Sequence, residues 1–266
     1  MDRIGQAFRD AREEGRSALI PYVTAGFPTL DRLPGLVKAL TRAGADVIEI
    51  GIPFSDPLAD GPVLQRAATE ALEAGTRIRD ILRVVSEIAA EAPPLVFLTY
   101  INPVFRYGVE AFARDSAAAG VAGWIIPDLP WLESRAVRDT ASQHGLALIP
   151  LAAPTSTDQH LKAIARGQGF VYGVSVTGVT GVREAVDTGV ETLVERVKTY
   201  VGLPVAVGFG ISTPDQAREV GRVADGVIVG SALVKTIAEH RDTAEDAAYQ
   251  FVRGLREALD NLAAKA

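Results

Sequence analysis

Eight short apolar runs recur along the chain and alternate with segments of helical character. The runs are ALIPYVTAG (18–26), DVIEIG (46–51), PLVFLTYINP (94–103), GWIIPD (123–128), LALIPLAAPT (146–155), FVYGVSVTG (170–178), PVAVGFG (204–210) and DGVIVG (225–230). Near-continuous apolar strands are typical of a parallel sheet buried under helices on both faces. Eight of them favour a closed barrel over an open doubly wound sheet. The sequence therefore predicts an α/β fold, a (β/α)8 TIM barrel forming a single domain over residues 1–266.

The helical segments refine this prediction. The spacer between the second and third runs is oversized, and GPVLQRAATEALEAG (61–75) predicts an extra helix inserted after the second strand. TAEDAAYQFVRGLREALDNLAAKA (243–266) predicts an amphipathic helix that closes the barrel. Four other helices are expected to end at a glycine in the left-handed conformation before the next strand: Gly44, Gly120, Gly145 and Gly167.

Composition restricts the classes of function. Apolar residues make up 48% of the chain and charged residues 23%, which are ordinary globular proportions. The formal net charge of -6 provides no general attraction to nucleic acid or to an anionic membrane. Cysteine is absent, which excludes thiolate chemistry and disulfides. Because no secretory signal and no apolar stretch of membrane-spanning length is seen, a soluble cytoplasmic protein is expected.

Glu49 is the first candidate for chemistry, because working residues in barrels lie where strands end. In VIEIG, alternation places Val47, Glu49 and Gly51 on one face and the two isoleucines on the other. A carboxyl group in such an apolar run resists ionisation, which raises its pKa toward a value useful for a general acid or base. The alternative is a structural carboxylate paired with an arginine.

The loop after this strand, PFSDPLADGP, supplies Asp56 and Asp60. Asp-Pro and Asp-Gly pairs are also ordinary turn chemistry, which is the alternative for both residues. Asp60 nevertheless follows a strand that already offers Glu49. Two carboxyl groups in different environments can divide the acid and base roles between them.

Three late strand ends are rich in glycine: SVTGVTG with Gly178 and Gly181, VGFGIS with Gly208 and Gly210, and VGSALVKTI with Gly230 and Ser231. Together they resemble the phosphate site that barrels build from late loops and a helix N-terminus. Backbone N–H groups would hold the anion, although a tight turn alone also requires glycine.

The positions of lysine and histidine decide between lyase mechanisms. An imine-forming aldolase needs a lysine at a strand end, but every lysine considered falls in a predicted helical segment. A metal-dependent aldolase needs clustered ligands, yet the histidines are predicted in helices or at a helix end without paired spacing. Metal-free acid/base chemistry on a phosphorylated substrate is therefore expected. The residues concerned are Lys38, Lys162, Lys198, Lys235 and Lys265, all in predicted helical segments, and His144, His160 and His240.

Two strings, LIPYVTAGFP (19–28) and IEIGIPFSDPLADGP (48–62), resemble the signature motifs of the tryptophan synthase alpha family. The similarity continues through LTYINPVF, IIPDLP, YGVSVTGVTG, VAVGFGIS and ADGVIVGSALV, and so spans nearly the whole chain. The resemblance implies a carbon-carbon lyase of L-tryptophan biosynthesis that cleaves indole-3-glycerol phosphate to indole and D-glyceraldehyde 3-phosphate. It also implies a heterotetramer with a beta subunit. By the same resemblance, pyridoxal phosphate is bound only by that partner, and this chain has no cofactor and no metal.

The same resemblance assigns roles to individual residues. Glu49 and Asp60 match the catalytic pair of the family. The predicted indole slot contains Tyr22, Leu98, Tyr100, Ile125, Leu151, Tyr172 and Phe209, each of which is alternatively plain barrel core. The predicted phosphate site contains Thr180, Gly181, Phe209, Gly210, Gly230 and Ser231. The predicted partner surface contains Pro53, Asp56, Asn102 and Phe105, with local packing as the alternative for the proline and the phenylalanine.

One departure from the family is Val176, which stands where some relatives have arginine, in the loop where Thr180 is expected to close over the substrate and contact Asp60. Two rival functions remain open. One is another phosphate-binding barrel, such as an epimerase or a decarboxylating indole-glycerol-phosphate synthase, because a fold alone does not fix function. The other is a non-catalytic subunit that only activates a partner.

Overall fold

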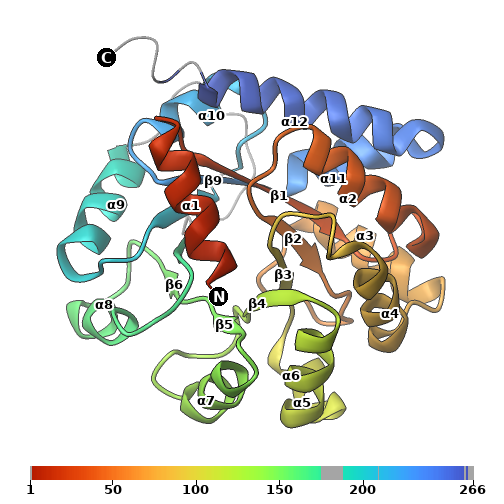
Figure 1. Cartoon of the computed structure of the whole chain (residues 1–266), viewed down its shortest axis with the longest axis horizontal. Coiled ribbons are helices and arrows are strands. Elements are labelled where there is room, and N and C mark those ends of the chain that lie inside the picture. The colour runs from red at the N-terminus through yellow and green to blue at the C-terminus, as the bar shows by residue number, and fades with distance from the viewer. Residues whose placement is uncertain (1, 175–187, 209, 261, 263–266) are drawn as a thin grey trace.

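The strands form one parallel sheet that curls into a ring (Figure 1). The computed structural model describes residues 2–174, 188–208, 210–260 and 262. Within them, the sheet order is β5-β4-β3-β2-β1-β9-β8-β7-β6, and each pairing is parallel. The strands are β1 (Ala18–Thr24), β2 (Ile48–Gly51), β3 (Leu95–Leu98), β4 (Val121–Ile125), β5 (Ala147–Leu148), β6 (Leu151–Ala152), β7 (Val171–Val174), β8 (Val205–Gly208) and β9 (Gly226–Val229).

The two ends of this order, β5 and β6, are halves of one interrupted strand. The Ile149 N–H donates to the Trp124 carbonyl of β4 at 2.8 Å, and the Pro150 carbonyl accepts from the Tyr172 N–H of β7 at 2.8 Å. Pro150 has no N–H with which to continue a ladder. Because the two halves are contiguous in sequence, the ring closes with eight strand positions, and the predicted (β/α)8 barrel is confirmed.

Helices cover the outside of the ring (Figure 1). The predicted extra helix after the second strand is α3, and the final amphipathic helix is α12. The helices are α1 (Arg3–Glu13), α2 (Leu33–Arg42), α3 (Pro62–Glu73), α4 (Ile78–Ile88), α5 (Ile101–Tyr107), α6 (Val109–Ala118), α7 (Arg135–Gln143), α8 (Asp158–Ile164), α9 (Thr188–Tyr200), α10 (Pro214–Gly221), α11 (Ser231–Glu239) and α12 (Ala244–Asp260), with 3-10 turns η1 (Leu30–Arg32) and η2 (Arg241–Thr243). None of the helices in the described residues is both long and apolar enough to cross a membrane.

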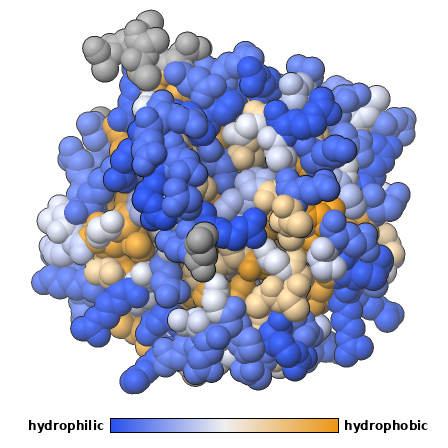
Figure 2. Space-filling view, in the orientation of Figure 1, coloured by the Kyte–Doolittle hydropathy of each residue, from blue (hydrophilic) through white to orange (hydrophobic). Residues whose placement is uncertain are grey.

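Helix α1, which the sequence did not lead us to expect, lies across one end of the ring (Figure 1). Its apolar residues Ile4, Phe8 and Ala11 fall on one face and are all buried. The Phe8 ring lies 5.3 Å from the Phe170 ring and rests against Gly226 of β9. This end of the barrel is thus plugged by side chains. Its outer surface is mostly hydrophilic, with hydrophobic side chains visible between the helices (Figure 2).

The predicted left-handed glycines are confirmed at three of four positions. Gly44, Gly120 and Gly145 have φ of +93°, +83° and +74°. Gly167 was a wrong prediction, because the left-handed residue before β7 is Gly169, with φ of +75°. Gly167 is required for a different reason: a Cβ there would lie 2.8 Å from the Pro150 ring.

A buried ionic network joins α12 to the starts of β1 and β2. Arg256, only 3% exposed, donates to Asp46 at 3.1 Å and to the Ser17 carbonyl at 3.3 Å. Asp46 also accepts from Arg16 at 2.8 Å and from the Leu19 N–H at 2.8 Å. Burial opposes both charges, since it raises the pKa of Asp46 and lowers that of Arg256. The network lies at the amino ends of the strands, where barrel residues serve stability.

Candidate active site

Glu49 lies on β2 with its side chain inside the barrel. The register pairs it with Tyr22 of β1 and Val96 of β3, and paired residues of neighbouring parallel strands point to the same face. The side chain is 0% exposed, and among the described residues neither carboxyl oxygen has a hydrogen-bond partner. Burial, and then the negative charge of Asp60, raise the pKa of Glu49 to about 8. The alternative of a structural ion pair is not met within the described residues.

Asp60 lies in the loop between β2 and α3 and is half-buried. Burial raises its pKa to about 6, while a hydrogen bond from the Tyr100 hydroxyl acts in the opposite direction. The same hydroxyl accepts from the Ala59 N–H at 3.1 Å, so Tyr100 fastens this loop to the end of β3. The two carboxyl groups therefore have different environments, because within the described residues Glu49 has no hydrogen-bonding partner whereas Asp60 accepts from Tyr100.

Two tyrosines cross the barrel beside these acids, and glycines make room for them. A Cβ at Gly51 would collide with the Tyr22 hydroxyl, and a Cβ at Gly208 would lie 3.3 Å from the Tyr172 hydroxyl. The Tyr22 hydroxyl hydrogen-bonds to Thr24 at 3.2 Å. Burial and the charges of Glu49 and Asp60 raise the pKa of both tyrosines, so they remain neutral. The pair provides flat apolar surface with polar tips, which suits a planar aromatic ligand.

The described residues of the predicted indole slot lie on or next to the inner face of the barrel. Leu98 is paired with Ile125, and Leu151 is paired with Tyr172. Tyr22, Leu98, Tyr100 and Ile125 are buried, whereas Leu151 and Tyr172 are half-buried. Phe209 lies outside the described residues. Most members are thus also core residues, and their predicted contact with a ligand stays a prediction.

An anion could be held beside Tyr22, at the N-terminus of α11. Gly230 is its N-cap and makes no side-chain capping bond, and Ser231 is the first helical residue. A Cβ at Gly230 would lie 3.7 Å from the Tyr22 Cβ, which places the start of this helix next to the barrel interior. The N–H groups of a first helical turn have no partner within their own helix, and together with the helix dipole they favour an anion there. Gly210 takes a left-handed conformation with φ of +64°, while Thr180 and Gly181 lie outside the described residues, as does Val176.

The predicted partner surface is exposed at three of its four residues. Asp56 and Asn102 are exposed, and Phe105 of α5 is 57% exposed although it is a large apolar residue. Pro53 is buried, which matches the alternative of local packing. Leu58, in the same loop as Asp56, is 88% exposed.

Some site residues were missed from sequence. Asp128, after β4, accepts from the Ile101 N–H at 2.9 Å and so caps α5. An acidic residue at a strand end was a visible signal. Gly51 gave none, because its importance depends on the Tyr22 ring from the neighbouring strand. Thr24, two residues after Tyr22 on β1, matters through its hydrogen bond to the Tyr22 hydroxyl.

The lysine and histidine predictions agree with the described structure. Lys38, Lys162, Lys198 and Lys235 lie in α2, α8, α9 and α11, respectively, and Lys265 lies outside the described residues. His160 lies in α8, and His144 and His240 follow the ends of α7 and α11. Across the described ranges, no group of three or more His, Asp or Glu side chains could hold a metal ion.

The fold and the site define a class: an α/β barrel with two carboxyl groups of raised pKa, one on an inner strand face and one in the following loop, and a helix N-terminus suited to an anion. Residues 8–263 match the family model for the tryptophan synthase alpha chain. The chain belongs to the tryptophan synthase alpha chain family, whose members are lyases that cleave indole-3-glycerol phosphate.

Individual relatives agree. The tryptophan synthase alpha chain of Caldanaerobacter subterraneus subsp. tengcongensis is 47% identical over 262 residues, covering 97% of this chain and all of that relative. That of Synechocystis is 48% identical over 263 residues, with 97% of this chain and 100% of the relative covered. Among solved structures, a Mycobacterium tuberculosis tryptophan synthase matches with a TM-score of 0.91 and 41% identity, covering 97% of this chain and 98% of that one. The alpha chain of Legionella pneumophila matches with a TM-score of 0.91 and 34% identity, and 98% of each chain is covered.

Proposed function

We propose that this chain works as the alpha subunit of a tryptophan synthase and splits indole-3-glycerol phosphate into indole and D-glyceraldehyde 3-phosphate, with Glu49 and Asp60 as its catalytic residues. The observation that carries the proposal is the buried Glu49, which has no described partner and a pKa raised to about 8. At neutral pH such a group holds its proton and is ready to donate it. Asp60, with a pKa of about 6, is mostly a carboxylate at the same pH.

The proposed steps need only these two groups, with Glu49 transferring protons and Asp60 stabilising charge. Indole is a poor leaving carbanion, so Glu49 first donates its proton to C3 of the indole ring. Asp60 stabilises the positive charge that develops on the ring nitrogen, an interaction stronger in the transition state than in the ground state. The Glu49 carboxylate then takes the proton of the neighbouring glycerol hydroxyl. The bond between that carbon and C3 breaks, its electron pair restores the aromatic ring, an aldehyde forms, and Glu49 is again protonated.

Binding is proposed to divide between two regions. The indole ring would lie against Tyr22, Leu98, Tyr100, Ile125, Leu151, Tyr172 and Phe209. The phosphate would be held by Thr180, Gly181, Gly210, Gly230 and Ser231, whose backbone N–H groups can serve a protein with a net charge of -6.

The wider setting follows from the family. We expect a cytoplasmic protein that works as one domain and binds a beta subunit through Asp56, Asn102 and Phe105, in a heterotetramer of two alpha and two beta subunits. Pyridoxal phosphate belongs to that beta subunit, which would consume the indole. The inclusion of the strands in a single ring supports one domain.

Incubation of the purified chain with indole-3-glycerol phosphate, with and without a beta subunit, tests the proposal by following indole release. Release in either mixture is expected. Absence of release in both would contradict the proposal and favour a barrel of other specificity. Stimulation of a beta subunit without any release would favour the non-catalytic alternative.

A further inference from the structure

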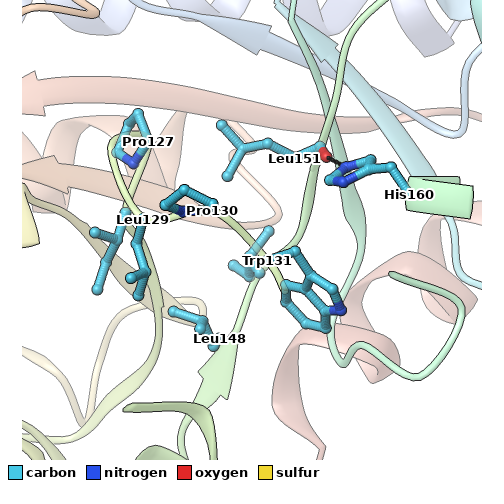
Figure 3. A pocket seen from close by; sticks show the side chains of 9 residues that line it. Pro127, Leu129, Pro130, Trp131, Leu148, Leu151 and His160 are labelled. Atoms are coloured by element: carbon cyan, nitrogen blue, oxygen red, sulfur yellow. Dashed lines mark hydrogen bonds between the residues drawn. The ribbon is translucent and has the colours of Figure 1, made fainter. Parts of the chain in front are cut away.

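A small cavity lies beside the proposed indole slot, between the fourth strand position and the interrupted fifth (Figure 3). Its volume is about 120 Å³. The side chains around it come from three elements, namely the loop after β4, the two halves of the fifth strand, and α8. They include Pro127, Pro130, Trp131, Leu148, Leu151 and His160.

The cavity exists because the sheet parts at this point. The Pro150 carbonyl faces β7, so alternation turns the Leu151 carbonyl toward β4. That carbonyl accepts from Nε2 of His160 at 2.8 Å. Across the gap, the Ile126 carbonyl accepts from the Leu129 N–H of its own loop at 3.2 Å. Both carbonyls are therefore bonded outside the sheet, and no ladder bond between β4 and Leu151 is needed to satisfy them.

This opening passes from the helix layer to the barrel interior. The Trp124 ring packs 4.8 Å from the Phe112 ring of α6, so Trp124 faces the helices, and its register partner Leu148 faces the same way. Leu151 is the register partner of Tyr172, whose ring lies 6.4 Å from the Phe170 ring that packs on Phe8 inside the barrel, so Leu151 faces the interior. Because Leu148 and Leu151 both line the cavity, it spans the wall of the barrel.

The outer side of the cavity is held in place. The Trp131 side chain donates from Nε1 to the Ala163 carbonyl at 3.0 Å, and the Arg138 guanidinium lies 4.6 Å from the centre of its ring. Two proline rings stiffen the same loop. Because its walls are held in place and its lining is mostly apolar, space of this size can take a small apolar group, and cavities of about 150 Å³ in another protein bind benzene.

We propose that this cavity is an accessory pocket of the substrate site, which takes a small apolar substituent, such as a methyl group, on the benzene ring of the indole moiety. Leu151 lines the cavity and also belongs to the proposed indole slot, so a substituent on the ring reaches the cavity past this side chain. The inference rests on the proposed function and extends it to ring-substituted substrates.

The test compares kcat/KM for indole-3-glycerol phosphate with kcat/KM for its analogues methylated at ring positions 4, 5, 6 and 7, using the complex with a beta subunit. Release of glyceraldehyde 3-phosphate is measured, since this product is independent of the substituent. Leu148→Phe fills the cavity from the helix side, and Leu148→Ala enlarges it. Leu132→Phe is the matched control, because Leu132 follows Trp131 in the same loop but is 65% exposed and does not line the cavity.

For at least one methyl position, we expect the ratio of kcat/KM for the analogue to that for the parent to fall about tenfold in Leu148→Phe and to stay unchanged in Leu132→Phe. In Leu148→Ala, the ratio for the corresponding ethyl analogue should rise by a similar factor. If Leu148→Phe does not fold, Leu148→Ala still tests the pocket in the opposite direction.

Equal ratios in the wild type and both Leu148 variants would overturn the pocket, as would rejection of all four analogues by the wild type. Failure of the wild type to cleave the parent compound would instead contradict the proposed function. In that case, the proposed pocket is tested by titrating the four methylindoles. Binding that is lost in Leu148→Phe but kept in Leu132→Phe supports the pocket. Equal binding by both variants overturns it.

Discussion

Glu49 is held in a position where folding opposes its ionisation. It is fully buried, and the described residues offer neither carboxyl oxygen a partner, whereas buried polar groups are normally hydrogen-bonded. A protein that keeps such a group gives up stability for chemistry. The measurable consequences concern catalysis, stability and their pH dependence.

Glu49→Gln should lower indole release by about 10²–10⁴-fold, the usual contribution of a general acid, because an amide cannot donate the proton. Thermal stability should stay near that of the wild type or rise. The raised pKa lets the folded state hold a proton that the unfolded state has lost, so this stabilisation is complete below about pH 4.5 and is lost as pH rises through about 8. Unfolding measured from pH 4 to 9 should therefore show a steeper decline for the wild type than for Glu49→Gln. Substantial turnover by the variant would show that another group supplies the proton.

The pH dependence of indole release should be bell-shaped. Activity should rise as Asp60 ionises near pH 6 and fall as Glu49 loses its proton near pH 8. In Tyr100→Phe, the hydrogen bond that lowers the pKa of Asp60 is absent, so the acidic limb should move to higher pH. The position of the limb is the readout, because Tyr100 also belongs to the proposed indole slot. An acidic limb that does not move would remove Asp60 from this role.

For single residues, the sequence was informative where a residue is chemically unlike the rest of its predicted strand. Glu49 interrupts an apolar run, and that conflict is visible without a structure. Asp60 looked like turn chemistry, because its burial and its bond from Tyr100 depend on how the loop folds back. Gly51 acquires its importance from the Tyr22 ring of the adjacent strand, which no local pattern encodes. Thr24 lies two residues after Tyr22 on β1, but its hydrogen bond to the Tyr22 hydroxyl depends on how that side chain is turned.

Among the helices and strands, the N-terminus of α11 allows an effect on phosphate binding to be separated from an effect on stability. Ser231→Asp would place a negative charge in the first turn of this helix, where it interacts favourably with the helix dipole. The same charge would repel a bound phosphate. We therefore expect the KM for indole-3-glycerol phosphate to rise about tenfold or more while the melting temperature is unchanged or higher, a combination that general damage to the fold would not produce. Ser231→Ala is the control, and an unchanged KM in Ser231→Asp would place the phosphate elsewhere.

Elements were predictable where their signal is local. The alternation of runs and helical segments identified the barrel and the helix inserted after β2. Helix α5 was missed because it has seven residues and its first N–H is capped by Asp128, which lies far away in sequence. The spacing of Ile4, Phe8 and Ala11 in α1 is itself a local signal for an amphipathic helix. Division of the fifth strand depends on Pro150 and on its two neighbours in the sheet.

For the whole molecule, stability and chemistry lie at opposite ends of the barrel. The ionic network of Arg256, Asp46 and Arg16 lies at the amino ends of the strands, and the candidate site lies at their carboxyl ends. Substitutions at one end should therefore leave the other largely unaffected, because distant sites are usually additive.

Arg256→Met should lower the free energy of unfolding by about 3 kcal/mol, because it leaves Asp46 buried with one cation fewer. Arg253→Met on the same helix should lower it by less than about 1 kcal/mol, since Arg253 is half-exposed and its ion pair with Glu257 is at the surface. Urea unfolding measures both. The KM for indole-3-glycerol phosphate should be the same in both variants, and a change confined to Arg256→Met would mean that the two ends are coupled.

Phe105→Asp should weaken binding to a beta subunit about tenfold or more, because a large apolar side chain that is 57% exposed becomes a charge in the proposed partner surface. Phe105→Leu should weaken binding less. The stability of the isolated chain should hardly change in either variant. Titration calorimetry with a beta subunit measures the affinity, and equal binding by all three proteins would move the interface away from α5.

Closure of the ring has a consequence for synthesis on the ribosome. Strand β1 emerges early and can pair with β2, but its other edge pairs with β9, at residues 226–229 near the end of the chain. Arg256, which anchors α12 against the starts of β1 and β2, emerges later still. Throughout translation, the nascent chain therefore presents an open, apolar strand edge, which is the kind of surface that aggregates or recruits chaperones. One edge of β1 therefore stays unpaired until β9 has been synthesised, and the fold is complete only with the last turns of α12.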